Sequence, residues 1–510
     1  MKSVIESALT ISTEIKKLIS KNVLNNFDNY AYTGDNANYC ISLFQENLIN
    51  PSEKNKEYLY DLGQTLIKWS ENNLVNGYFK MTDVHHGTEL FLGFLPRYIS
   101  LFPEDEKAKL LIINAADFIG NWNDRQVNWF NYKKEIFNSW YLGSSGYAND
   151  KVYSFNTADH IRFIHLAILA WEISGERKYL DWSFIYGKMF AKRILNSKKD
   201  IPVAWDKNGI EYFPNDMIGN TEKFLAANHH HLPNDPMSGV ENLLASGAIF
   251  AFGNLYKIFK DDIFLKTSKK IISCLLNIIV EPYSDPVAAS VSFYRNTFFD
   301  FSFDSQILKI LENIPQHNES EIMLGIFEKN KIRLSGVGNR KDMVFWFTLN
   351  NNIPKPLNEP PTSFFTLAYQ ITGKIKYAER ALDMASRKIK VATSVLRDGS
   401  EHADMGCTIS SIISGHGRNW GIGPVSGCYP MLLIGSDENF SNTVTLIKFL
   451  TPTISLGCIP LIRVLNDQSV EINIYNFSQN KTNIVFIYNN KNKKISVNLD
   501  PKTSISKILS

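Results

Sequence analysis

The sequence predicts a mainly α-helical protein in which helical hairpins close into a toroid, followed by a small antiparallel β module. Two observations support this fold class. Over roughly the first 440 residues, apolar side chains recur with the period of amphipathic helices, and one hairpin turn occurs twice. From about Gly457 onward the apolar period falls to two, which is typical of strands. We therefore expect a helical domain over residues 1–445 and a β domain over residues 446–510.

The repeated hairpin is the most specific helical signal. Ala170–Tyr179 aligns with Ala368–Tyr377, and in each copy a helix ends in a hydroxylated residue followed by Gly175 or Gly373. Glycine after the last helical residue adopts the left-handed conformation that closes the final turn. A Lys-Tyr pair then opens the next helix. One hairpin cannot bury its own apolar face, so repeated hairpins must stack or close into a ring.

Irregular spacing distinguishes these hairpins from a solenoid of short, strict repeats. Long interruptions separate them, notably Asp124–Tyr153, Asp200–Met237 and Pro282–Glu359. Insertions of this kind fit a closed toroid whose loops build a site at one end.

The β module is predicted from three short segments. Val470–Phe477 and Lys494–Leu499 largely alternate apolar and polar residues, whereas Ile484–Tyr488 is a continuous apolar run typical of a more buried strand. Polar turns separate them, and the module is too short for a large sandwich.

Composition excludes several classes of protein. The 510 residues carry 54 Lys and Arg against 51 Asp and Glu, a net charge of +3, without the basic excess of a nucleic-acid-binding protein. Aromatic residues make up 13% of the chain, which favours a ligand cleft lined with rings. The chain has 5 cysteines and no C-x-x-C pair, so neither a zinc site nor a disulfide framework is expected.

The apolar segments indicate neither a signal peptide nor a membrane span. Residues 1–23 carry charges among their apolar residues and read as an amphipathic helix. Ile271–Val280, the most apolar stretch, is too short to cross a bilayer. We therefore expect a cytoplasmic protein without a membrane or nucleic-acid partner and without a metal or other cofactor; the oligomeric state stays open.

A first polar cluster precedes the apolar helix expected over residues 90–102. Asp83, or Thr82, can cap this helix. The polar side chains of its first turns are His85, His86 and Glu89. His85 and Glu89 are four residues apart and share one face. The cluster is either a capped, solvated turn or a polar site at a helix N-terminus; a zinc site is disfavoured because the order is not H-E-x-x-H.

A second cluster opens the apolar helix Phe163–Ile173 and contains Asp159, His160 and Arg162. An acid at a helix N-terminus is also explained by the helix dipole alone. However, two helices about one hairpin apart each open with Asp and His, and in a toroid both N-termini can face one cavity. Two carboxylates across a cleft are what glycosidic bond cleavage requires: one donates a proton to the leaving oxygen, and the other is ionised.

A third cluster is the loop that contains Asn228 and His229, within a run of three histidines. It is either a solvated loop or the site of a β-eliminating lyase. In such a lyase a neutral amide polarises a uronate carboxylate, and an imidazole removes the adjacent proton.

The fourth cluster, over residues 397–404 and 414–424, is the densest in polar residues and glycines. Glycines let a ligand approach the backbone closely. Arg418 suits a carboxylate or sulfate, and Trp420 can stack on a sugar face. Glu401 is a reserve candidate for either acid role. The candidate substrate contacts here are His402, His416, Arg418 and Trp420. No phosphate-loop motif is present, so nucleotide binding is disfavoured.

The hairpin turns at 170–179 and 368–377 resemble those of the (α/α)6 six-hairpin toroid superfamily of carbohydrate-active enzymes, and this resemblance covers roughly residues 30–440. Within it, Thr82–Phe94 and Asn156–Trp171 are similar to segments of the unsaturated glucuronyl hydrolases. That resemblance implies two catalytic aspartates on successive inner helices, which are Asp83 and Asp159 here.

The dipeptide Asn228-His229 resembles one found in toroid polysaccharide lyases such as alginate and heparin lyases. Those chains generally carry a large β-sandwich after the toroid, whereas this chain has a short β tail.

The leading hypothesis is a glycoside hydrolase that acts on an acidic, uronate-containing oligosaccharide, with Asp159 as general acid/base and Asp83 as its partner carboxylate. The substrate contacts expected near them are His85, His86 and His160. A polysaccharide lyase that uses Asn228 and His229 is the first alternative, and a non-catalytic glycan-binding protein is the second. An isoprenoid cyclase is disfavoured because no D-D-x-x-D or D-x-D-D run is present.

Overall fold

The structure is a computed structural model. It describes residues 2–18, 44, 47, 50–198, 201–202, 204–213, 243–244, 246–276, 279, 285–313, 323–328, 331–333, 344–350, 353–356, 362–395, 447–466, 469–488 and 494–510.

The described residues are mainly helical, with small antiparallel sheets. The α-helices are α1 (Lys2–Leu18), α4 (Glu53–Asn73), α5 (Val84–Leu92), α6 (Phe94–Leu101), α7 (Glu106–Ile119), α8 (Arg162–Ser174), α9 (Arg177–Asn196), α13 (Ala248–Phe259), α14 (Asp262–Leu275), α15 (Asp285–Phe298), α16 (Asp304–Glu312), α17 (Thr362–Thr372) and α18 (Ile375–Val395). Two short 3-10 helices, η3 (Lys151–Tyr153) and η4 (Ala158–Ile161), precede α8.

The strands form six small sheets. They are β1 (Thr82–Asp83), β2 (Phe130–Asn131), β3 (Ile136–Phe137), β4 (Tyr141–Gly143), β5 (Gly146–Tyr147), β6 (Phe155–Thr157), β7 (Ala204–Asp206), β8 (Glu211–Tyr212), β9 (Met323–Glu328), β10 (Lys331–Arg333), β11 (Val344–Asn350), β12 (Ile353–Pro356), β13 (Ile447–Phe449), β14 (Cys458–Val464), β15 (Val470–Asn476), β16 (Thr482–Tyr488), β17 (Lys494–Leu499) and β18 (Ser504–Leu509).

The repeated hairpin turn is confirmed at both of its expected positions. Gly175 ends α8 with φ 73°, and Gly373 ends α17 with φ 69°. In each case the glycine N–H donates to the carbonyl four residues earlier, at 2.7 Å. The second helices of these hairpins, α9 and α18, each begin two residues after the glycine. Left-handed glycine closes both turns without the steric cost that a Cβ would bring.

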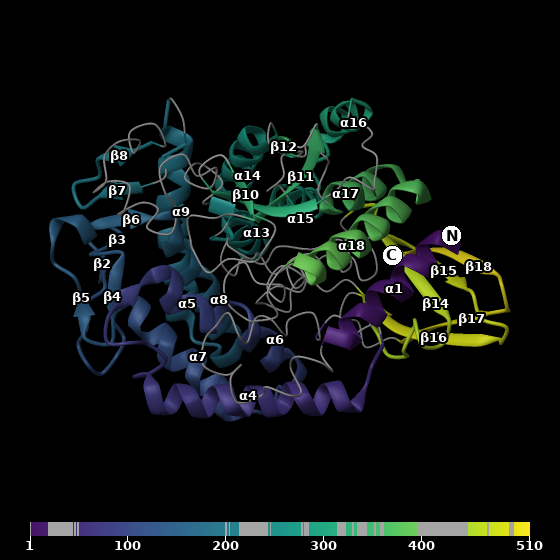
Figure 1. The fold of residues 1–510 in the computed structure, drawn as a ribbon. Helices are drawn as coiled ribbons and strands as arrows, with labels where there is room; N and C mark the ends of the chain where they lie inside the picture. The colour runs from purple at the N-terminus through teal and green to yellow at the C-terminus, as the bar shows by residue number, and fades with distance from the viewer. Residues whose placement is uncertain are drawn as a thin grey trace.

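The helices pack against one another in chain order: α7 against α8, α9 against α14, α13 against α15, and α15 against α17 (Figure 1). The N-terminal helix α1 packs against α18, so segments from the two ends of the helical region lie side by side. In α8 every residue from Arg162 to Ala170 is buried, which is typical of a helix surrounded by neighbours. Closure into a six-hairpin ring stays a prediction.

Two three-stranded antiparallel sheets form the C-terminal β module, in the orders β14-β15-β18 and β13-β16-β17. The three predicted strands are confirmed as β15, β16 and β17. Buried and partly exposed residues alternate strictly along β15, as its sequence period predicts. The boundary at residues 445 and 446 stays a prediction.

A further four-stranded antiparallel sheet, in the order β10-β9-β11-β12, lies within the segment that we expected to be a loop interruption. A usable sequence signal for this sheet was the apolar run at the start of β11, residues 344–347, which is of the same kind as Ile484–Tyr488.

Three small sheets, built from strands β1 to β8, hold the two helix starts that the sequence singled out. Strand β1 pairs with β4, so Asp83 stands opposite Tyr141. Strand β6 pairs with β7, which places Thr157 opposite Ala204. In addition, the Asn156 side chain donates to and accepts from the Phe137 backbone, at 2.8 and 2.9 Å. The backbone is therefore fixed immediately before both α5 and η4.

Among the helices that the structure describes, none combines the length and the apolar character needed to cross a membrane.

Candidate functional site

The first helix start is organised by Asp83. It is the last residue of β1 and has extended backbone angles, φ −76° and ψ 160°, as expected for an N-cap. One carboxylate oxygen accepts the His86 backbone N–H at 2.8 Å, and the other accepts the His86 Nδ1–H at 2.7 Å. Both hydrogen bonds favour the ionised form of this carboxylate. The prediction that Asp83 can cap the helix is confirmed.

The second helix start is organised by His160. Its Nδ1 accepts the backbone N–H of Thr157 at 3.1 Å, so Nε2 carries the proton and donates to the Ser139 carbonyl at 3.1 Å. The ring is 0% exposed and lies against Phe137. Burial lowers the pKa of His160 to about 4, because the charged imidazolium loses its hydration. The ring is neutral near pH 7.

This geometry corrects the expectation that His160 contacts substrate. The backbone occupies both of its ring nitrogens, and no part of the residue reaches the surface. Its position follows from the short reach of an N3 side chain back to the N-cap, which is a local property of the turn. His160 therefore has a structural role, which is to hold η4 in place.

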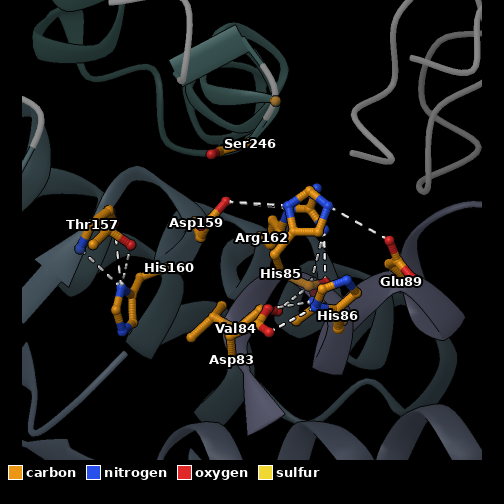
Figure 2. A network of polar contacts seen from close by, with 12 residues as sticks. Asp83, Val84, His85, His86, Glu89, Thr157, Asp159, His160, Arg162 and Ser246 are labelled. Carbon is orange, nitrogen blue, oxygen red and sulfur yellow. Dashed lines mark hydrogen bonds and ion pairs between the residues drawn. The ribbon is translucent and has the colours of Figure 1, made fainter. Parts of the chain in front are cut away.

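His85 connects the two helix starts. Its Nε2 lies 3.5 Å from Oε1 of Glu89, on the same helix, and its Nδ1 lies 3.6 Å from Oδ1 of Asp159, on η4. Figure 2 shows the imidazole between the two carboxylates. The two helix starts therefore lie together at His85 and Asp159, and the cavity expected between them stays a prediction.

Arg162, at the first position of α8, holds the other side of this arrangement. Its Nη1 donates to the His85 carbonyl at 3.0 Å and to the Thr88 hydroxyl at 3.3 Å. Its Nε lies 3.9 Å from the same Asp159 oxygen that faces His85. One guanidinium thus fixes the backbone of α5 and places a positive charge beside Asp159.

The cluster of Asp83, His85, Glu89 and Asp159 is buried, with exposed fractions of 4–7%. The side chain of His86 is more open, at 29%. Electrostatic interactions strengthen where water is excluded, so the protonation states of these groups are strongly coupled. His86 marks the side on which the cluster approaches solvent.

Two participants were not singled out as site residues from the sequence. Glu89 was recognised only as sharing a face with His85, and that i, i+4 spacing is the signal that could have identified it. His165 gave no signal: it lies one turn into α8 and donates its Nε2–H to the carbonyls of Ser246 and Gly247, at 3.3 and 3.1 Å. It joins α8 to the start of α13.

The remaining predicted site residues lie outside the described residues. They are Asn228, His229, Glu401, His402, His416, Arg418 and Trp420. Their roles stay predictions.

Within the described part of the chain, no group of three or more His, Cys, Asp or Glu side chains is arranged to hold a metal ion. What the observed cluster offers is proton transfer. It brings together carboxylates, imidazoles and a fixed guanidinium, the groups that carry general acid–base chemistry.

No protein-family model matches the chain, and no curated protein matches it in sequence. A search of solved structures finds similarity to an unsaturated glucuronyl hydrolase from Streptococcus agalactiae, with 13% identity and a TM-score of 0.42 over 62% of this chain and 82% of that one. A UGL variant with dGlcA-Glc-Rha-Glc gives 12% identity and a TM-score of 0.42, over 62% of this chain and 86% of that one. At this level of similarity, function has to be argued from the geometry of the site.

Proposed function

We propose that this protein is a glycoside hydrolase that acts on an acidic, uronate-containing oligosaccharide. The observation that carries the proposal is the convergence of two helix starts, 77 residues apart at His85 and Arg162, on one cluster that contains Asp83 and Asp159. Cleavage of a glycosidic bond needs two carboxyl groups in different protonation states. We assign the proton-donating role to Asp159 and the ionised role to Asp83.

Asp159 is the proposed general acid. Its carboxyl oxygen faces the imidazole of His85, which can supply a proton, and the Arg162 Nε lies 3.9 Å from the same oxygen. In the reaction, the protonated Asp159 donates its proton to the leaving glycosidic oxygen as the bond between that oxygen and the anomeric carbon breaks.

Asp83 is the proposed partner carboxylate. Its two hydrogen bonds from His86 keep it ionised. An ionised carboxylate either takes a proton from the attacking water or attacks the anomeric carbon itself. His86, the most open member of the cluster, is the proposed first contact for the sugar. The preference for an acidic sugar depends on Arg418, which lies outside the described residues.

The test is turnover by Asp159→Asn and Asp83→Asn variants on a panel of uronate-containing oligosaccharides and matched neutral ones. We expect wild-type protein to release reducing ends without new ultraviolet absorbance, preferring the acidic substrates. Each variant should lose about 10²- to 10⁴-fold in kcat, the usual value of one general acid or base. Asparagine keeps the size of the side chain and caps helices well, so folding is preserved.

Asp261→Asn is the matched control. Asp261 is likewise an N-cap, accepting the Ile263 N–H at 3.1 Å at the start of α14, and it is ion-paired with Lys188 at 2.8 Å. Its replacement should leave turnover unchanged. New ultraviolet absorbance from wild-type protein, abolished by His229→Ala, would instead establish a lyase. Saccharide binding that survives both aspartate substitutions, without turnover on any substrate, would establish a non-catalytic binding protein.

A further inference from the structure

We infer that His85 and Glu89 form a proton-holding pair that keeps a transferable proton beside Asp159. The inference rests on the proposed function, because it assigns the source of the proton that Asp159 donates. His85 and Glu89 act through Asp159, so they are positioning residues.

The geometry around the imidazole carries this inference. Both ring nitrogens face carboxylate oxygens, at 3.5 Å on the Glu89 side and 3.6 Å on the Asp159 side. A neutral imidazole has one N–H and one lone pair, so with both carboxylates ionised it would direct its lone pair at a carboxylate oxygen. Only an added proton removes this repulsion. Catalytic hydrogen bonds often shorten from such distances when substrate binds.

Charge balance within the buried cluster points the same way. With His85 protonated and both carboxylates ionised, the charges of Glu89, His85, Asp159 and Arg162 sum to zero. Without that proton, the same four groups carry a net negative charge at sites that are 1–6% exposed. Opposite charges placed side by side reduce the cost of burying each of them, so this arrangement favours a proton on His85.

The proton has two positions within this arrangement. At rest we place it on Nδ1 of His85, which faces Oδ1 of Asp159 at 3.6 Å. Transfer breaks the Nδ1–H bond and forms an O–H bond on Asp159, leaving neutral His85 with its Nε2–H directed at Glu89. The sum of charges is unchanged. After Asp159 has given its proton to the leaving oxygen, a proton from solvent restores the imidazolium.

The other charged groups that face His85 are part of this balance. The His86 ring lies edge-on to His85, with ring centroids 5.5 Å apart, and is itself paired with ionised Asp83. Protonation of His86 would oppose the charge on His85, whereas Asp83 offsets it. Glu89 is the carboxylate that faces Nε2, at 3.5 Å. Its removal should therefore weaken proton binding by His85.

The first measurement follows the protonation of His85 directly, by nitrogen NMR on full-length protein with isotope-labelled histidine. The His85 signal is assigned by its loss in His85→Gln. We expect Glu89→Gln, which keeps the shape of the side chain, to lower the titration midpoint of His85 by about one to three pH units. Glu106→Gln is the matched control: Glu106 is an exposed helix residue paired with Lys109, and its replacement should leave the midpoint unchanged.

His160 and His165 serve as internal references. Burial lowers the pKa of each to about 4, so both should stay neutral through the range in which His85 titrates. A His85 signal that is neutral throughout, or a midpoint that Glu89→Gln does not move, would overturn the inference.

The second measurement is the pH profile of kcat. Glu89→Gln should shift the alkaline limb to lower pH by about the same amount as the NMR midpoint, while keeping the maximal rate at low pH within a few-fold of wild type. A merely structural role for Glu89 would lower kcat equally at every pH and would contradict the inference.

The hydrolase proposal and the proton-holding pair can be refuted independently of each other. A wild-type protein without turnover, in which the NMR shift persists, would refute the hydrolase and leave the proton-holding pair intact. Turnover that depends on Asp159 together with an unmoved His85 midpoint would support the hydrolase and refute the pair.

Discussion

Three histidines close to the two helix starts differ in what their ring nitrogens contact. His160 and His165 donate to backbone carbonyls in fully packed surroundings, whereas His85 lies between two carboxylates. A carbonyl accepts a hydrogen bond from the ring N–H but carries no full negative charge to stabilise an imidazolium, so burial keeps the first two rings neutral. At His85, the two neighbouring carboxylates favour the protonated ring instead. At the scale of single residues, the contacts of the ring rather than the residue type decide the role.

The two neutral histidines make stability depend on pH. Burial lowers the pKa of both to about 4 in the folded state, whereas in the unfolded chain it is near 6.5. The unfolded chain therefore binds more protons between these values. Their contribution to stability is complete above about pH 6.5 and is lost as the pH falls toward 4, by about 3 kcal/mol for each ring.

The urea midpoint measured at several pH values between 7 and 4 checks this expectation. In His165→Gln the decline should be smaller than in wild type by about the contribution of one ring, because one of the two buried neutral histidines is removed. His86→Gln is the comparison: this side chain is 29% exposed, and its replacement should leave the decline in place. Identical slopes for wild type and His165→Gln would contradict the prediction.

The ends of elements follow local rules that the sequence expresses clearly. Asp83 caps α5, and Gly175 and Gly373 close their helices in the left-handed conformation, all three as expected. The expectation failed at Gly93, where a break with φ −104° and ψ −77° separates α5 from α6. Pro96 lies in the first turn of α6, where its missing N–H costs little, and this was a usable signal for the break.

Gly175 provides a clean test of the hairpin turn. A Cβ built on it would meet nothing within 4 Å, so substitution strains only the backbone at φ 73°. We expect Gly175→Ala to lower the free energy of unfolding by about 1 kcal/mol, measured by urea denaturation. Gly175→Asn should recover part of this loss, because asparagine tolerates the left-handed region. Equal stability of Gly175→Ala and wild type would contradict this explanation of the repeated motif.

Gly373 closes the same kind of turn in a different setting. A Cβ there would run into the guanidinium of Arg463, on β14, so the turn between α17 and α18 is also where the helical region contacts the β module. Gly373→Ala should therefore be more destabilising than Gly175→Ala. At Gly175 the motif only closes a turn. At Gly373 it closes a turn and also leaves room for Arg463 of the β module.

At this turn the β module contacts helix α17 of the helical region. Arg463 Nε donates to the Gln370 carbonyl near the end of α17 at 3.1 Å, and Nη1 lies 3.3 Å from Glu471 on β15. The Gln370 side chain in turn accepts from the Ser292 hydroxyl on α15 at 2.6 Å. Arg463 therefore links the β module to α17, and Gln370 links α17 to α15.

Arg463→Met tests how much this junction contributes. It removes the donor to the Gln370 carbonyl, and we expect the free energy of unfolding to fall by about 1 kcal/mol. Lys481→Met is the control: Lys481 pairs with Asp500 at 3.2 Å, but both side chains are more than 60% exposed, so its loss should be close to neutral. An Arg463→Met variant as stable as Lys481→Met would show that the junction does not depend on this hydrogen bond.

The sequence by itself determined the helical hairpins with their glycine stops, the cap at Asp83, and the strands at 470–477, 484–488 and 494–499. Each of these follows from hydrogen bonds or apolar periodicity within a few residues, which the sequence records directly. Only the tertiary structure decided that His85 lies against Asp159, that Nε2 of His160 reaches the Ser139 carbonyl, and that Arg463 reaches α17. The physical reason is that these contacts join segments distant in sequence, so they depend on how whole helices and sheets pack, and no local pattern specifies that packing.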